Sequence, residues 1–311
     1  MDLGIKGKTA LVVAASKGMG KASAMSLAAE GARVVMCARG EAALKDAAAE
    51  VKRQTGAEVL AVPADVSRAA DISRVVAEAG RAFGGVDILV ANAGGPPPGP
   101  FESMTDAQWT AAFEQVHLST VRLIREVLPH MKKGRWGRIL AIQSSSVKQP
   151  VEGLVLSNGI RPAIAGLFKT LAGDLAPDNI TVNLVLPGRI KTDRFLEHQT
   201  DRAKRAGITL EQQMALSSAD IPMGRIGTPE EFAAMVVFLA SARASYVTGT
   251  VVQVDATSFT LDTDVDLHNA DGLCFFDRRR RYRLLRGGLR CRHLDRGRGQ
   301  RFRRAGRLFW S

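Results

Sequence analysis

The sequence predicts an α/β fold with a doubly wound parallel sheet, and two observations support this prediction. Apolar segments of strand length alternate along the chain with stretches typical of helices. The apolar segments form continuous runs rather than alternating with polar residues, as expected of strands that helices cover on both faces. Strand–helix–strand repetition also implies right-handed crossovers and therefore parallel strands. We expect a single domain over residues 1–262 and a tail of different composition over residues 263–311.

Each element of this fold is predicted from a local pattern. The strands are expected, in chain order, at residues 9–15, 32–38, 57–64, 86–92, 137–143, 179–187 and 249–255. Helices are expected between them, at residues 20–31, around 41–54, from about 67, over 105–133, over 153–176 and from 228. The start at Thr228 has the sharpest signal, because Pro229 suits the first helical turn and Glu231 is placed to close a capping box.

Composition narrows the class of protein. The chain has 311 residues, 46% of them hydrophobic, which suffices for one large α/β domain. Its three cysteines, Cys37, Cys274 and Cys291, are an odd number without close spacing, so we expect neither a disulfide framework nor a metal site. The first residues lack the pattern of a signal peptide, and no apolar run has the length of a membrane span. A cytoplasmic protein is therefore expected.

The net charge of +12 is concentrated at one end of the chain. From Arg278 onward there are fourteen arginines, no lysine and one acid, Asp295, so residues 1–277 are close to neutral. Three interpretations of this segment remain open: an arm that binds nucleic acid or a membrane surface, a disordered extension, or an out-of-frame translation of a GC-rich gene end. The absence of lysine and the sharp compositional break favour the last interpretation, and we rank it and disorder above a functional arm. We expect a disordered basic tail, with contact to nucleic acid only through it.

A glycine-containing loop follows the first strand. It reads Ala14-Ala15-Ser16-Lys17-Gly18-Met19-Gly20 and leads directly into a helix. Glycines at this place let backbone amides approach a diphosphate, and the positive end of the helix dipole favours the anion. Turns also need glycine, so the loop alone is a weak signal. Its position in a repeated β/α pattern strengthens the interpretation as a dinucleotide-binding loop.

Four motifs in the right order resemble the short-chain dehydrogenase/reductase family over roughly residues 5–262. The loop from Val13 to Gly20 resembles the family's Thr-Gly-x-x-x-Gly-x-Gly, with Val13-Ala14 in place of Thr-Gly. The other three are Asp65-Val66, Ala91-Asn92-Ala93-Gly94 and Pro187-Gly188. The chain is most similar to 3-oxoacyl-(acyl-carrier-protein) reductase-like members with degenerate motifs. This resemblance implies a Rossmann-type fold, a carbonyl or acyl substrate, and a homo-oligomer formed through the helices near 105–133 and 153–176.

The same resemblance implies a set of cofactor-binding residues. Asp65 corresponds to the carboxylate that meets the adenine amino group, and Ile190 and Thr192 correspond to residues that face the nicotinamide amide. The full predicted set comprises Ser16, Lys17, Gly18, Met19, Gly20, Arg39, Asp65, Val66, Asn92, Ala93, Gly94, Pro187, Gly188, Ile190 and Thr192. Ala14 adds a methyl group where the family has glycine, which is tolerated easily only at negative φ.

Charges near the second strand favour NADP over NAD. An acid at the end of this strand would bind the ribose hydroxyls of NAD, whereas a base accepts the additional phosphate of NADP. Arg39 lies there with no acid before Glu41, and Lys17 in the glycine loop can reach the same phosphate. The alternative is that both are solvated surface charges. We expect NADPH as the cofactor.

The family's catalytic residues have largely changed in this chain. In the family a tyrosine transfers the proton, a lysine four residues later lowers its pKa, and a serine thirteen residues before it polarises the carbonyl. The corresponding positions are Ser157, Arg161 and Ser144, and the family's supporting asparagine corresponds to His117. Serine is far less acidic than a phenol, and a guanidinium stays protonated at neutral pH.

Two classes of function therefore compete within the domain. One is an NADP-dependent oxidoreductase that interconverts a carbonyl and an alcohol, in which Ser144 polarises the oxygen and His117, through Ser157 or a water, supplies the proton. In the alternative interpretation, His117 only fills the space of the asparagine. The other class is a catalytically impaired protein that binds a dinucleotide or a partner. A third class would associate with nucleic acid through the arginine-rich tail.

Overall fold

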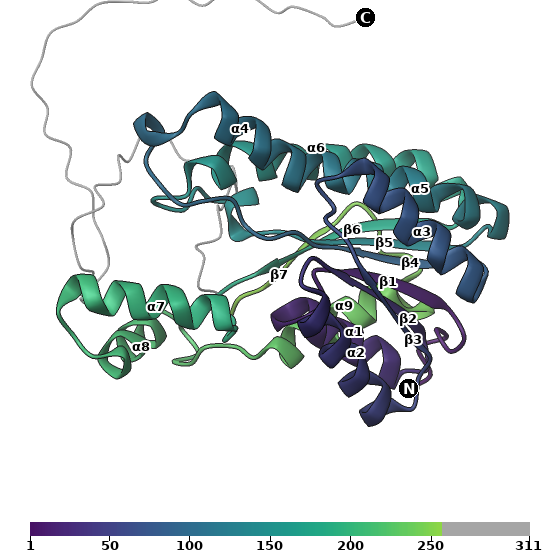
Figure 1. Ribbon diagram of the computed structural model, residues 1–311, viewed down its shortest axis with the longest axis horizontal. Coiled ribbons are helices and arrows are strands. Elements are labelled where there is room, and N and C mark those ends of the chain that lie inside the picture. Colours follow the sequence, from purple (N-terminus) through teal and green to yellow (C-terminus); the bar gives the residue numbers. More distant parts are fainter. Residues whose placement is uncertain (257–311) are drawn as a thin grey trace, which may run out of the picture. The chain divides into compact units, whose positions relative to one another are not determined.

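The computed structural model describes residues 1–256 (Figure 1). The predictions for the tail, including its disorder and its contact with nucleic acid, concern residues outside this range. Within residues 1–256, no helix is long and apolar enough to cross a membrane.

All seven predicted strands are present in one parallel sheet. They are β1 (Thr9–Val13), β2 (Arg33–Ala38), β3 (Val59–Pro63), β4 (Ile88–Ala91), β5 (Gly137–Ile142), β6 (Ile180–Pro187) and β7 (Val251–Val254). The strand order is β3-β2-β1-β4-β5-β6-β7, and every pairing is parallel. The order reverses between β1 and β4, so the loops after these strands diverge and leave a crevice at their carboxyl ends. The predicted doubly wound α/β fold is confirmed.

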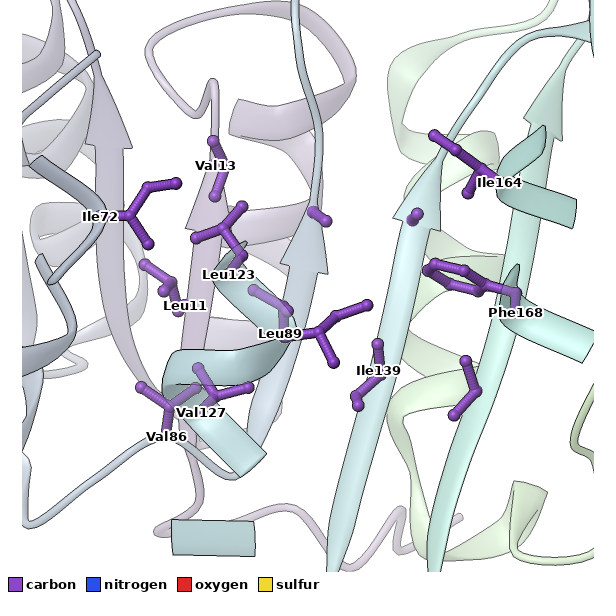
Figure 2. Packing of buried hydrophobic residues seen from close by; sticks show 14 of the residues in the cluster. Leu11, Val13, Ile72, Val86, Leu89, Leu123, Val127, Ile139, Ile164 and Phe168 are labelled. Carbon is purple, nitrogen blue, oxygen red and sulfur yellow. The ribbon is translucent and has the colours of Figure 1, made fainter. Parts of the chain in front are cut away.

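Helices cover both faces of the sheet (Figure 1). On one face lie α1 (Gly18–Ala29), α2 (Glu41–Thr55) and α9 (Pro229–Ala240), and on the other α3 (Ala69–Phe83), α5 (Ser119–Gly134) and α6 (Val155–Leu175). Figure 2 shows the second face, where Leu123 of α5 and Phe168 of α6 pack against the strands. Burying a side chain of this size contributes about 1.5–3 kcal/mol. Burial on both sides thus explains the apolar character of the inner strands β1, β2, β4, β5 and β6.

One predicted helix is interrupted in the structure. Instead of one helix from Thr105, the chain forms α4 (Asp106–Phe113), a π-helical turn η2 (Glu114–Leu118) and α5. Thr105 caps α4 with a complete capping box. A π-turn accommodates an extra residue within an otherwise continuous helix and is often found at functional sites. The turn changes which side chains of this segment face the sheet.

The segments that follow β5 and β6 lie at the carboxyl ends of the strands. A short 3₁₀ turn, η3 (Ser145–Val147), follows β5, and α7 (Asp193–Ala206) and α8 (Leu210–Ala219) follow β6. These two helices lie away from the sheet in Figure 1. The predicted capping box of α9 is confirmed, because Thr228 Oγ1 accepts a hydrogen bond from Glu231 N and the Glu231 carboxylate accepts one from Thr228 N.

Candidate active site

A cleft of about 1380 Å³ lies at the carboxyl ends of the strands. It brings together most of the residues predicted to bind a cofactor: Ser16, Lys17, Gly18, Met19, Gly20, Arg39, Asp65, Val66, Asn92, Ala93, Gly94 and Thr192. Three of the four predicted catalytic residues, Ser144, Ser157 and Arg161, line the same cleft. Segments up to about 180 residues apart in the chain therefore meet in one place, as the crevice of a doubly wound sheet requires.

The glycine loop is tightly folded against the first turn of α1. A Cβ on Gly20 would lie 2.4 Å from the carbonyl oxygen of Ala14, so only glycine fits there. Ala14 itself has φ +53°, a left-handed conformation that costs a non-glycine residue about 1–2 kcal/mol. Ala14 therefore does not have the negative φ at which its methyl group would be tolerated easily. The chain holds the loop in this shape despite the strain, and places its backbone on the cleft surface.

Two cations lie along this end of the cleft. Lys17 is the N-cap residue of α1, and Arg39 follows β2. Both are exposed, and neither forms an ion pair within residues 1–256. They remain available to an anionic group.

Polar contacts hold the loops that follow β3 and β4. The Asp65 carboxylate accepts hydrogen bonds from Ser67 N at 3.0 Å and from Ser67 Oγ at 2.8 Å. The Gln115 side chain, from the π-turn, donates to the carbonyl of Gly94 at 3.0 Å. The π-turn thus positions Gln115 across the loop after β4, a contact that no sequence motif indicated.

A buried hydrogen-bonded network occupies the chemical end of the cleft. Ser157 and Arg161 are one turn apart on α6, and Arg161 Nε donates to Ser157 Oγ at 3.1 Å. Arg161 Nη1 donates to Gln143 Oε1 at 2.8 Å. On the other side, Ser146 Oγ lies 2.9 Å from Ser157 Oγ. Ser144 Oγ accepts from the backbone of Ser146 and caps the η3 turn.

Arg161 has an unusual environment for a charged side chain. It is only 5% exposed and forms no ion pair among the described residues. Burial, followed by repulsion from Arg194, lowers the pKa of the Arg161 guanidinium to about 10. It therefore remains a cation at neutral pH and supplies a fixed positive charge next to Ser157.

Comparison with known proteins shows the family to which this chain belongs. Residues 13–256 match the family model described as Enoyl-(Acyl carrier protein) reductase. The chain is 36% identical over 253 residues to the 3-oxoacyl-[acyl-carrier-protein] reductase of Salmonella typhimurium, covering 81% of this chain and 98% of that protein. The chain belongs to the short-chain dehydrogenase/reductase family.

Two further members of this family are similar over a comparable length. The NADPH-dependent reductase BacG of Bacillus subtilis is 31% identical over 256 residues, covering 81% of this chain and 97% of that protein. The crystal structure of L-sorbose reductase from Gluconobacter frateurii, complexed with NADPH and L-sorbose, is 34% identical with a TM-score of 0.79. The match covers 82% of this chain and 98% of the L-sorbose reductase chain.

His117 was predicted to be a catalytic residue, but the structure does not place it at the cleft. His117 lies in the π-turn and stacks on Phe113, with ring centroids 4.9 Å apart. Its Nδ1 is buried without a hydrogen-bond partner among the described residues, and burial lowers the pKa of the imidazole. Burial thus favours the neutral imidazole, and His117 is not among the residues that line the cleft.

Three predicted cofactor residues also lie outside the cleft lining: Pro187, Gly188 and Ile190. A Cβ on Gly188 would lie 2.5 Å from Asp255 Cβ, so glycine is needed there for close packing after β7. Ile190 is buried and bridges to Gly227. Conversely, Gln143, Gln115 and Arg194 line the cleft without having been predicted as site residues. Of these three, only Arg194 stands out in the sequence, because residues 189–207 contain several other basic residues.

Proposed function

We propose that this protein is an NADPH-dependent oxidoreductase that interconverts a carbonyl and an alcohol, with a substrate similar to a 3-oxoacyl group. The observation that carries the proposal is the convergence of the glycine loop, the two exposed cations Lys17 and Arg39 and the Ser144–Ser157–Arg161 group on one cleft. Each part has a distinct chemical use, and the family's relatives include NADPH-dependent reductases.

The residues of the cleft fit the proposed cofactor. The Gly20 backbone leaves no room for a side chain against Ala14, as expected where amides must approach a diphosphate. Lys17 and Arg39 suit the additional phosphate of NADP. The Asp65 carboxylate and the carbonyl of Gly94 are each fixed by hydrogen bonds from neighbouring residues. Bound NADPH would supply a hydride to the carbonyl carbon of the substrate.

The chain's own residues would then act on the carbonyl oxygen. Ser144, at the N-terminus of the η3 turn, lines the cleft and can polarise that oxygen by donating a hydrogen bond to it. Arg161 supplies positive charge in a buried environment, where it stabilises developing negative charge more than it would in water. Such a site favours the transition state of carbonyl reduction without the tyrosine of the family.

The replacement of that tyrosine also favours a second candidate function. Ser157 is a weak acid, and Arg161 does not exchange its proton at neutral pH. A protein that binds a dinucleotide or a partner without turnover remains the alternative.

Calorimetric titration of the full chain with NADPH, and separately with NADH, tests the proposal. We expect micromolar or tighter binding of NADPH and much weaker binding of NADH. Replacing both Lys17 and Arg39 with alanine should weaken NADPH binding and leave NADH binding unchanged. Lys52→Ala, which removes an exposed lysine of α2 outside the cleft, is the matched control.

The two candidate functions give different outcomes. Binding of NADPH followed by its oxidation in the presence of a 3-oxoacyl thioester or another carbonyl compound supports the reductase. Binding without turnover across a broad set of carbonyl compounds favours the binding protein. Failure to bind either nucleotide overturns the proposed oxidoreductase.

A further inference from the structure

We propose that Ser146, a residue outside the family's catalytic positions, positions the hydroxyl of Ser157 so that its proton points into the cleft. The inference rests on the proposed reductase function and deepens it. Ser146 is 2% exposed and Ser157 is 6% exposed, and their hydroxyl oxygens lie 2.9 Å apart. Ser157 lines the cleft, whereas Ser146 does not.

The direction of one hydrogen bond in the network is certain from chemistry alone. A guanidinium has only donors, so Ser157 Oγ must accept the bond from Arg161 Nε. Arg161 Nη1 likewise donates to Gln143 Oε1, and these two bonds hold the guanidinium in place. One lone pair of Ser157 is therefore engaged with a cation.

The contact between the two serines then has two arrangements. Either Ser157 donates to Ser146, and its proton is turned away from the substrate, or Ser146 donates to Ser157. In the second arrangement Ser157 accepts two hydrogen bonds, one from a cation, and its own proton is free for an oxygen in the cleft. Hydrogen bonds in such a chain strengthen one another, so Ser157 becomes a better donor.

The proton balance of the reduction follows from the second arrangement. As the carbonyl carbon receives a hydride, the π electrons of the carbonyl move to its oxygen, and that oxygen takes the proton of Ser157 Oγ. The remaining Ser157 alkoxide is stabilised by the Arg161 N–H and the Ser146 O–H. A water molecule in the cleft then gives a proton to the Ser157 alkoxide, and a solvent proton neutralises the hydroxide that this leaves, so that each reduced carbonyl consumes one proton from solvent. Ser146 acts only through Ser157 and is therefore a positioning residue.

Ser146→Ala removes the donor, and Ser145→Ala is the matched control, because Ser145 is a buried serine of the same η3 turn outside the network. We expect Ser146→Ala to lower kcat by about tenfold, the effect of losing one ordinary hydrogen bond. KM for substrate and Kd for NADPH should change by less than about twofold, because neither ligand would contact Ser146. Ser146→Thr, which keeps the hydroxyl, should recover most of the rate.

A second measurement does not depend on turnover. The Arg161 Nε–H resonance in a ¹H–¹⁵N spectrum of the full chain, assigned by its loss in Arg161→Lys, reports the electron density on Ser157 Oγ. It should shift in Ser146→Ala and stay in place in Ser145→Ala. An unmoved resonance overturns the coupling between Ser146 and Ser157.

The kinetic outcomes separate this inference from the proposed function. An unchanged kcat in Ser146→Ala overturns the positioning role. A loss of kcat that comes with a lower Tm and weaker NADPH binding also overturns it, because that combination indicates a structural effect. If the wild-type chain binds NADPH but reduces no carbonyl compound, the proposed function fails, and the catalytic role of Ser146 fails with it. The resonance then decides whether the hydrogen-bonded coupling exists.

Discussion

Replacing Gly20 with alanine should damage both the fold of the cofactor loop and its ligand binding. The new Cβ would lie 2.4 Å from Ala14 O, 3.0 Å from Ala14 C and 3.2 Å from Asn92 Nδ2, whereas ordinary contact begins at 3.4 Å. The two backbone segments must therefore separate by about 1 Å, because a backbone carbonyl cannot rotate away as a side chain can. Ala14 is already strained at φ +53°, and the next residue is held by a hydrogen bond from Ala15 N to Cys37 O.

The size of this overlap determines the expected loss of stability and of NADPH affinity in Gly20→Ala. Overpacking of this kind costs about 1–3 kcal/mol. For a domain of this size, each kcal/mol lowers Tm by about 2–4 °C. The displaced amides should also weaken NADPH binding by about 10-fold or more, since a lost hydrogen bond to a charged group costs about 1.5–3 kcal/mol.

Thermal unfolding and calorimetric titration of NADPH provide the assay, with Gly80→Ala as the control. Gly80 lies within α3, and a Cβ there would meet no atom within 4 Å. This control should raise stability by about 0.5–1 kcal/mol, because alanine favours the helix, and should leave NADPH affinity unchanged. An unaltered Tm together with unaltered NADPH affinity in Gly20→Ala would refute the argument.

Three further predictions concern titratable groups. The ion pair with Arg225 and the hydrogen bond from Thr228 N hold the pKa of Glu231 at about 2, below its ordinary value of 4.5. The contribution of Glu231 to the stability of the fold is therefore present above pH 4.5 and is lost as the pH falls towards 2. Glu231→Gln should therefore show a shallower loss of Tm over this range, and parallel curves would contradict the assignment. Burial raises the pKa of the Cys37 thiol to about 12, so iodoacetamide at pH 8 should label Cys37 only after denaturation, as mass spectrometry would detect. His117→Asn should leave kcat/KM within about threefold of the wild-type value across the pH profile, because His117 does not line the cleft. If the variant loses an ionisation near neutral pH from this profile, His117 is the proton donor after all.

Local patterns were sufficient to predict the elements of the fold. All seven strands were predicted, because strands that helices cover on both faces are mainly apolar. The start of α9 was predicted because a capping box involves only residues within one turn. The interruption of the helix between Thr105 and Gly134 was not predicted, because an added residue in a helix changes no local residue preference.

The site was predicted only in part. Spacing along α6 correctly brought Ser157 and Arg161 together, because residues four apart share a helix face. Spacing also singled out Ser144, and it does line the cleft, but the hydroxyl in contact with Ser157 belongs to Ser146. Which serine of that run faces α6 depends on the η3 turn and on how it packs, neither of which the spacing contains.

By itself, the sequence determined which segments become strands and helices, and which loop residues end up at the carboxyl ends of the strands. These properties depend on neighbours within a few residues. Only the tertiary structure decided that Ala14 is left-handed, that Gln115 crosses to Gly94, and that Arg161 is buried between Gln143 and Ser157 with no ion pair within residues 1–256. The Gln115–Gly94 and Arg161–Gln143 contacts join segments that are far apart in the sequence, so their distances and directions arise only when the sheet is assembled.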